Sequence, residues 1–254
     1  MPDTNFDFTG QVALITGGST GIGRATALAF ARHGARVVVG DLNDEGSETV
    51  ELIKNAGGDG LFVRTDVSDG AQVRALVEKT VTHFGRLDCA FNNAGILPDT
   101  QLLAEVEEGA FDRVISVDLK GVFLCLKEEI RHMLKAGGGA IVNTASIAGV
   151  IADPGMSSYV AAKHGVIGLT KAAAIDYAKS GIRINALAPG LVSTPMTQRW
   201  LNDPAMAPLV LAGPLMGRAA QPQEMVGMVL FLCSSMASFA TGQTFIIDGG
   251  QTAH

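Results

Sequence analysis

Short apolar runs rich in β-branched residues alternate with longer, helix-like segments along the whole chain. There are seven such runs: VALIT (12–16), RVVVGD (36–41), LFVRTD (61–66), LDCAFNNAG (87–95), AIVNTAS (140–146), IRINALAPG (182–190) and TFIIDGG (244–250). Strands and helices in strict alternation form β-α-β units, which build a parallel sheet covered by helices on both faces. The sequence therefore predicts an α/β fold, with one doubly wound domain over residues 1–254 and about seven parallel strands.

The composition fits one large apolar core. Hydrophobic residues make up 47% of the 254 residues, and a net charge of -6 argues against nucleic acid as a partner. Cys89, Cys125 and Cys233 lie in apolar runs without paired spacing, so we expect buried free thiols in a reducing compartment. No apolar stretch is long enough to span a membrane, and residues 1–11 lack the apolar core of a signal peptide. We therefore expect a cytoplasmic protein without a membrane partner.

The alternation breaks between residues 195 and 222. This segment contains five prolines, at positions 195, 204, 208, 214 and 222, together with several large apolar side chains. Long insertions of this kind are uncommon in compact domains unless they serve a function. We expect residues 195–222 to form a lid near the carboxyl end of the sheet.

A glycine-rich sequence, TGGSTGIG at residues 16–23, joins the first predicted strand to a helix. Gly17, Gly21 and Gly23 permit a pyrophosphate to approach the backbone closely, at the positive end of that helix. The strand before the loop and the helix after it provide the context in which this spacing indicates a dinucleotide site.

Asp41, at the end of the second predicted strand, fits the same site. A carboxylate there accepts a hydrogen bond from the 2′-hydroxyl of an adenosine ribose and repels a 2′-phosphate. Two unit charges about 4 Å apart repel by about 4 kcal/mol at an effective dielectric constant of about 20. No lysine or arginine near Asp41 in sequence offsets this charge, so we expect NAD as the cofactor, preferred over NADP by about 100-fold or more. An exposed turn carboxylate is the alternative interpretation.

Tyr159 and Lys163 are four residues apart in SSYVAAKHG (157–165) and would share one helix face. The Lys163 ammonium, helped by a positive nicotinamide ring, would favour the phenolate of Tyr159. A shift of the phenol pKa from about 10 to about 7 needs about 4 kcal/mol, which one or two close charges supply. Ser146, which ends the fifth predicted strand, is a candidate hydrogen-bond donor to a substrate oxygen. A solvated helix face and a turn-forming serine are the alternatives.

In their order along the chain, these motifs resemble the classical short-chain dehydrogenase/reductase family. The shared residues are TGxxxGxG at 16–23, Asp66-Val67, NNAG at 92–95, the set Ser146, Tyr159 and Lys163, and PG at 189–190. The resemblance covers nearly the whole chain. It implies a Rossmann domain that binds a nicotinamide dinucleotide and interconverts a secondary alcohol and a ketone, with Tyr159 as general acid/base and Ser146 as the donor to the substrate oxygen.

The resemblance also implies a set of cofactor contacts. Lys163 would bind the nicotinamide ribose, and Asn93 would lie beside the adenosine ribose. The other contacts are Gly17, Ser19, Thr20 and Ile22 at the pyrophosphate and adenosine ribose, Leu42 next to Asp41, Asp66 and Val67 at the adenine, and Val192 and Thr194 at the carboxamide. The five histidines lack ligand spacing, so no metal is expected.

One position departs from the family pattern. The family usually has asparagine in a VNLxG context, whereas this chain has VDLKG at 117–121, with Asp118 at that position. A carboxylate there would stabilise the Lys163 ammonium and weaken its effect on Tyr159. Aspartate has the shape to replace the asparagine, or it has a role of its own. We expect Asp118→Asn to change the rate by less than tenfold, or about 1.4 kcal/mol.

The candidate pocket is mostly small or apolar, which favours a hydrophobic or cyclic secondary alcohol. Its expected lining is Ile96, Leu97, Ile147, Ala148, Val150, Met156 and Trp200, with Asp153 either as a polar contact or in an Asp-Pro turn. Reduction of a 3-oxoacyl thioester is the alternative within the same class. A non-catalytic dinucleotide-binding regulator is the alternative of another class. The resemblance further implies a homotetramer built on two long helices, at about 106–133 and 157–180, and on the last strand.

Overall fold

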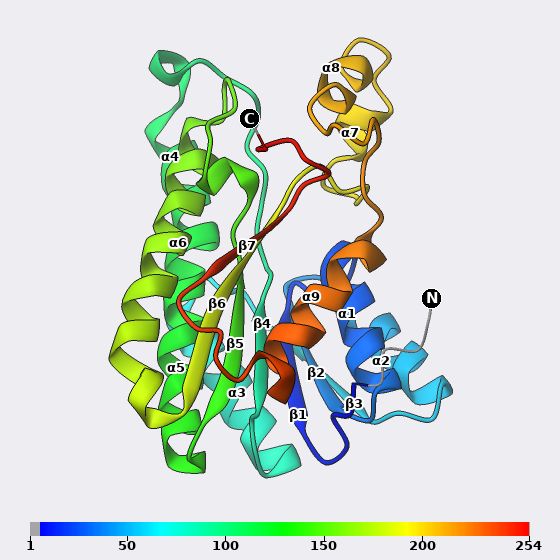
Figure 1. Cartoon of the computed structure of the whole chain (residues 1–254), viewed down its shortest axis with the longest axis vertical. Coiled ribbons are helices and arrows are strands. Elements are labelled where there is room, and N and C mark those ends of the chain that lie inside the picture. Colours follow the sequence, from blue (N-terminus) through cyan, green and yellow to red (C-terminus); the bar gives the residue numbers. More distant parts are fainter. Residues whose placement is uncertain (1–5, 254) are drawn as a thin grey trace.

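A single sheet of seven parallel strands forms the centre of the protein, as seen in a computed structural model that describes residues 6–253 (Figure 1). The strand order is β3-β2-β1-β4-β5-β6-β7, so the predicted parallel sheet is confirmed. The first five residues and His254, which the expected domain included, lie outside the described residues. The strands are β1 (Val12–Thr16), β2 (Arg36–Asp41), β3 (Gly60–Arg64), β4 (Cys89–Asn92), β5 (Gly139–Thr144), β6 (Ile182–Pro189) and β7 (Thr244–Ile247).

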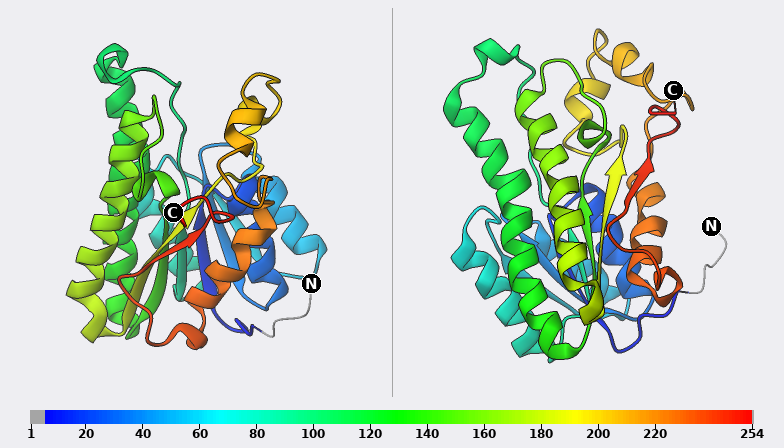
Figure 2. Two further views of the ribbon diagram at one scale, coloured as in Figure 1. Left: turned by 45° about the horizontal axis from the view of Figure 1, so that its top comes forward. Right: turned by 60° about the vertical axis from the view of Figure 1, so that its left-hand side comes forward.

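Helices cover both faces of this sheet (Figure 1 and Figure 2). One face packs against α1 (Gly21–Arg32), α2 (Gly46–Asn55) and α9 (Pro222–Cys233), and the other against α3 (Gly70–Phe84), α5 (Gly121–Ala136) and α6 (Ser157–Tyr177). Three short helices, α4 (Glu108–Val114), α7 (Gln198–Leu201) and α8 (Ala207–Leu211), stand beyond the carboxyl ends of the strands. The last two lie in the segment expected to form a lid.

Several strands end earlier than their apolar sequence suggested. Residues 65–66, 93–95 and 145–146 were expected within strands, but they leave the hydrogen-bonded ladder. All three segments lie at the carboxyl edge of a parallel sheet, where the backbone turns into the next connection. The apolar pattern continued past the strand because these residues remain largely sheltered from solvent.

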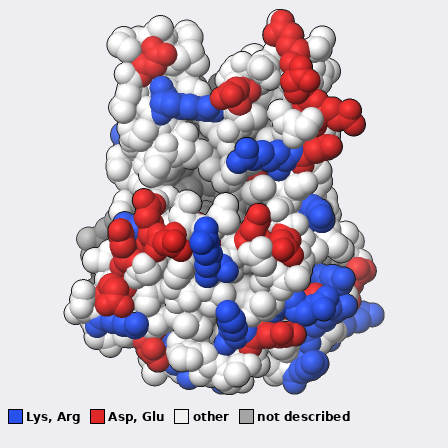
Figure 3. Space-filling model, turned by 180° about the vertical axis from the view of Figure 1, so that it is seen from behind, with Lys and Arg blue, Asp and Glu red and all other residues white. Residues whose placement is uncertain are grey.

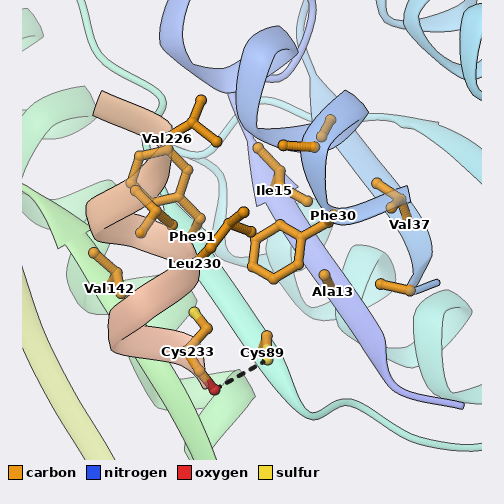
Figure 4. Close-up of a cluster of buried hydrophobic side chains, with 14 of the residues drawn as sticks. Ala13, Ile15, Phe30, Val37, Cys89, Phe91, Val142, Val226, Leu230 and Cys233 are labelled. Atoms are coloured by element: carbon orange, nitrogen blue, oxygen red, sulfur yellow. Dashed lines mark hydrogen bonds between the residues drawn. The ribbon is translucent and has the colours of Figure 1, made fainter. Parts of the chain in front are cut away.

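The core beneath α9 contains two of the three cysteines (Figure 4). Cys89 from β4 and Cys233 from α9 lie side by side, among Phe30, Phe91 and Leu230. All three cysteines are free and buried, and burial raises the pKa of Cys125 well above its usual value. This agrees with the expected buried free thiols.

The expected long helix at 106–133 is interrupted. Helix α4 ends at Val114, a π-helical segment covers Ile115–Lys120, and α5 continues from Gly121. A π-helical turn adds a residue to the turn and rotates the side chains that follow it. Asp118 lies inside this segment and is fully buried. Sequence periodicity did not reveal the interruption because both flanking stretches have helical spacing.

A chain of buried polar side chains ties α5 to the sheet and to α6. Glu129 Oε2 accepts a hydrogen bond from Asn92 Nδ2 at 3.0 Å, and the same amide donates to Asn143 Oδ1 at 3.0 Å. Asn143 in turn donates to Thr170 Oγ1 at 3.0 Å. Within residues 6–253, Glu129 Oε1 and Asn92 Oδ1 have no hydrogen-bond partner. A proton on Glu129 would remove the buried charge and add a hydrogen-bond donor to this network.

This environment predicts a pH-dependent stability. Burial raises the pKa of Glu129 from 4.5 to about 7 in the folded protein, so stability falls as pH rises from about 4.5 to 7 and then levels off. Glu129→Gln stays neutral throughout. The stability of Glu129→Gln relative to the parent, measured as the free energy of unfolding in urea, should therefore be higher at pH 8 than at pH 5 by roughly 1–3 kcal/mol.

Glu128→Gln is the matched control, since it removes a carboxylate from the same helix. Glu128 is paired with Arg131 at 2.9 Å, so this variant loses an ion pair and gains nothing at pH 8. If Glu129→Gln raises the free energy of unfolding by the same amount at pH 5 and at pH 8, the pKa of Glu129 is not raised in the folded protein.

Candidate functional site

A cavity of about 830 Å³ opens at the carboxyl end of the sheet. It extends from the loop after β1 to the lid segment, between α4 on one side and α7 and α8 on the other. In the space-filling view of Figure 3, the molecule divides at its upper end into two projections with a hollow between them. This is where connections from different strands of a parallel sheet meet, and where ligands of such folds bind.

The glycine-rich loop forms one wall of this cavity. Gly17 and Gly21 have φ values of +64° and +53°, and a Cβ on Gly17 would lie 2.7 Å from the Cα of Ala94. The N-cap of α1, Thr20, makes no side-chain capping hydrogen bond, and the first turn of the helix has no acidic residue. The start of α1 therefore leaves backbone N–H groups for an anion, and this fits the pyrophosphate of a dinucleotide.

Asp41 lies in the cavity wall at the adenosine end predicted for it. Its carboxylate accepts hydrogen bonds from the backbone N–H groups of Ser19 and Asn43, each at 3.0 Å, which fixes its orientation. No lysine or arginine lies near Asp41 along the sequence, but the fold places an arginine on the neighbouring strand. Strand pairing aligns Asp41 with Arg64, which donates to Leu42 O at 3.2 Å and lies 3.9 Å from Asp44.

A buried ion pair forms the other end of the site. Lys163 Nζ lies 3.2 Å from Asp118 Oδ2, and both side chains are almost fully buried. Lys163 also donates to Thr144 O at 3.0 Å, while Asp118 Oδ1 accepts the N–H of Ile96 at 2.9 Å. Burial opposes the charge on Lys163, but the Asp118 carboxylate and Tyr159 together outweigh it and raise the pKa of the lysine. The ammonium is therefore stable at neutral pH.

Tyr159 is held beside this pair. Lys163 Nζ lies 5.3 Å from the centre of the Tyr159 ring, and both side chains line the cavity together with Ser146. Ser146 Oγ accepts the N–H of Ala148 at 3.1 Å, which leaves the hydroxyl hydrogen free for another acceptor. These residues come from α6 and the end of β5, so the fold brings together the catalytic set predicted from the sequence.

In the protein without a cofactor, the pKa of Tyr159 is raised. Burial raises the pKa of the phenol above its usual 10.0, and the carboxylates of Asp118 and Asp153 raise it further. Lys163 and the Ser146 hydroxyl only partly oppose these effects. In the protein without a cofactor the phenol pKa is therefore raised, chiefly because burial outweighs the lysine charge. The expected lowering toward 7 includes the charge of a bound nicotinamide ring and stays a prediction for the protein with its cofactor.

Most of the predicted cofactor residues line the cavity, and Ser19 does not. The lining includes Gly17, Thr20, Ile22, Asp41, Leu42, Asp66, Val67, Asn93, Tyr159, Lys163, Val192 and Thr194. Ser19 is buried below the loop, where its hydroxyl donates to Asn43 O at 3.2 Å. Asn93 also holds the loop, because its amide donates to Gly17 O at 3.0 Å.

The substrate end of the cavity is largely apolar. Ile96, Leu97, Ile147, Met156 and Trp200 line it as expected. Two expected residues do not: Ala148 is buried behind the wall, and Val150 is exposed outside it. Sequence reasoning missed Arg113, Ser116 and Gln251, which reach the cavity from α4, the π-helical segment and the chain after β7. None of the three belongs to a recognised motif, and only the fold brings them to the cavity.

Two further features concern metals and membranes. Across residues 6–253, no group of three or more histidine, cysteine, aspartate or glutamate side chains is arranged to hold a metal ion. Within the same residues, no helix has the length and apolar character needed to cross a membrane.

Comparison with known proteins gives consistent matches over nearly the whole chain. The family model described as enoyl-(acyl carrier protein) reductase matches residues 17–252. A 2,5-dichloro-2,5-cyclohexadiene-1,4-diol dehydrogenase of Sphingobium indicum is 45% identical, with 97% of this chain and 99% of the relative covered. A cis-4-hydroxycyclohexanecarboxylate dehydrogenase of Sinomonas cyclohexanicum is 44% identical, with 97% and 98% covered.

Solved structures agree with this fold. The crystal structure of levodione reductase has a TM-score of 0.93 and 40% identity, with 97% of this chain and 99% of that chain covered. A structure from Beutenbergia cavernae that contains NADP at low occupancy has a TM-score of 0.93 and 35% identity, with 98% and 100% covered. Both confirm a doubly wound domain around a parallel sheet.

The position of Asp118 predicts the ionisation of Tyr159. In the protein without cofactor, we expect Tyr159 to ionise above pH 10, because burial and the Asp118 carboxylate both disfavour the phenolate. Asp118→Asn removes that charge and moves the ionisation to lower pH. The measurement is an ultraviolet absorbance titration of phenolate, with Tyr159→Phe to isolate the signal of Tyr177, the only other tyrosine. An ionisation that stays in place or rises in Asp118→Asn would contradict this account.

Proposed function

Because the chain belongs to the short-chain dehydrogenase/reductase family, we propose that it is an NAD-dependent oxidoreductase that interconverts a hydrophobic or cyclic secondary alcohol and its ketone. The observation that carries this proposal is the meeting of Ser146, Tyr159 and Lys163 at the apolar end of a cavity whose other end is the glycine cradle. The relatives, which include dehydrogenases of cyclohexane derivatives, support the same class of substrate.

In this proposal Tyr159 is the general acid/base. A bound nicotinamide dinucleotide would exchange a hydride with the carbinol carbon. In ketone reduction the protonated Tyr159 donates to the forming alkoxide, which suits the raised pKa of its phenol. In alcohol oxidation Tyr159 takes the hydroxyl proton, and a positive charge brought next to it with the oxidised cofactor favours that step. Ser146 donates a hydrogen bond to the same oxygen.

The remaining residues hold the cofactor. Gly17, Thr20 and Ile22 receive the pyrophosphate and adenosine ribose, with Ser19 supporting their loop from below. Lys163 binds the nicotinamide ribose, and Asp118 keeps the lysine charged and oriented. The other contacts are Asp41, Leu42 and Asn93 around the adenosine ribose, Asp66 and Val67 at the adenine, and Val192 and Thr194 at the carboxamide.

The lid segment, residues 195–222, closes over the substrate. Trp200 from α7 and Met206, Leu209 and Val210 in and beside α8 contribute apolar wall. Arg199 Nη1 pairs with Asp99 Oδ1 at 3.0 Å and so joins α7 to the chain after β4 on the opposite side of the cavity. An apolar lid of this kind supports a ring-shaped substrate over a sugar or a charged acid.

The proposal includes a cytoplasmic homotetramer. Phe123 and Leu134 on α5 and Ile175 on α6 are exposed apolar side chains, and β7 is an edge strand. A second copy of the chain that packs on these elements would remove both the apolar surface and the open edge from water.

Asp41 predicts the cofactor preference. We expect kcat/KM for NAD to exceed that for NADP by about 100-fold or more, because the carboxylate repels a 2′-phosphate. Asp41→Ala should remove most of this preference, since it deletes the repelling carboxylate and leaves Arg64 on the neighbouring strand, where Asp44 only partly offsets its charge. The double variant with Arg64→Ala is the control and should use NADP less well than Asp41→Ala. Equal use of both cofactors by the parent would overturn the role of Asp41.

Turnover of an alcohol panel tests the function itself. We expect NADH formation with cyclic secondary alcohols and its loss by at least about 1,000-fold in Tyr159→Phe, which lacks the proton carrier. The panel contains cyclohexanol, aryl alcohols, polyols and a 3-hydroxyacyl thioester. Turnover of the thioester alone would favour the acyl-thioester reductase. Tight NAD binding without any turnover would favour the dinucleotide-binding regulator.

A further inference from the structure

The substrate end of the cavity contains one carboxylate with no partner. Asp153 lies between β5 and α6 and is half-buried in the cavity wall. Among residues 6–253, its side chain makes no hydrogen bond and no salt bridge. The other carboxylate at this end, Asp118, is paired with Lys163 and turned toward the catalytic set. Asp153 is therefore the carboxylate at this end that remains available to a ligand.

Asp153 is also close to the reacting end of the pocket. Its charge acts on Tyr159, where it helps to raise the pKa of the phenol, and burial raises the pKa of Asp153 itself. A half-buried carboxylate without a partner is only partly hydrated, so a ligand that supplies a donor gains a charge-assisted hydrogen bond. A ligand that brings a second negative charge is repelled at short range.

We propose that Asp153 selects the substrate: it accepts a hydrogen bond from a second donor on the ring, remote from the reacting carbon, and rejects rings that carry a carboxylate. The inference rests on the proposed function and narrows it from cyclic alcohols in general to cyclic diols. Among the relatives, one is named as a dehydrogenase of a ring diol and another as a dehydrogenase of a ring carboxylate, so both substrate types occur among similar chains.

Arg113 is the opposing charge in the same cavity. It comes from α4, its side chain is exposed, and within the described chain no ion pair joins it to Asp153. Its charge is not among the influences on Tyr159, whereas that of Asp153 is. Arg113 is exposed and hydrated, whereas Asp153 is half-buried, so solvent screens the Asp153 charge less and it acts more strongly on a ligand in the cavity.

The test compares ligands that differ in one substituent. Binding is measured with the protein saturated with NADH, which cannot oxidise the alcohols, by the fluorescence of Trp200, the only tryptophan, which lines the cavity. The ligands are cyclohexanol, cyclohexane-1,4-diol, 4-aminocyclohexanol and 4-hydroxycyclohexanecarboxylate. We also measure kcat/KM with NAD for each of these ligands. The ratio of kcat/KM between two ligands is compared for each variant, because a general loss of activity cancels in that ratio.

For the parent we expect about tenfold tighter binding of the diol than of cyclohexanol, and about tenfold weaker binding of the carboxylate. Asp153→Leu should abolish both differences. Asp153→Asn keeps a neutral acceptor and should relieve the penalty on the carboxylate while retaining part of the preference for the diol. A preference for 4-aminocyclohexanol that disappears in Asp153→Asn would identify an ammonium as the natural donor in place of a hydroxyl.

Asp112→Asn is the matched control, because Asp112 is exposed on α4 and lies outside the cavity wall. It should leave all the ratios unchanged. The same ratios in the parent and in both Asp153 variants would overturn the inference, as would tighter binding of the carboxylate than of cyclohexanol by the parent. Absent turnover with the predicted fluorescence ratios would instead contradict the proposed function and leave the role of Asp153 supported.

Discussion

The buried ion pair between Lys163 and Asp118 holds the site together. It joins α6 to the π-helical segment, and each partner makes one more bond to the backbone. Lys163 donates to the end of β5 at Thr144, and Asp118 accepts from the chain after β4 at Ile96. Removing one partner of such a pair leaves an uncompensated buried charge, at a cost of about 3–5 kcal/mol. Four segments of the cavity wall are therefore positioned by two side chains.

The same pair sets the proton chemistry. A lysine beside a tyrosine favours the phenolate, but a carboxylate beside the lysine takes back much of that effect. Burial has the largest effect and raises the pKa of the phenol, so Tyr159 keeps its proton in the free protein. In the proposed mechanism, Tyr159 is therefore ready to donate a proton in the free protein. A positive charge that arrives with an oxidised cofactor would make it a better base.

The parallel sheet and most of the residues that meet at its carboxyl edge could be predicted from the sequence alone, because strand alternation and ordered motifs are local signals. It did not reveal the π-helical interruption, since helical spacing continues through Asp118. It also missed Arg64 beside Asp41, because that proximity arises from strand register. The exclusion of Ala148 and Val150 from the pocket follows from the turn after Ser146, whose direction no periodicity encodes.

We propose that this cavity carries out hydride transfer from a ring carbinol carbon. The most direct measurement uses cyclohexanol deuterated at that carbon, with NAD and the purified protein, and follows the mass of the reduced cofactor. We expect the NADH to carry one deuterium and to form more slowly than it does from the unlabelled alcohol. Reduced cofactor without the label, or bound NAD that stays oxidised with every ring alcohol, would contradict this proposal.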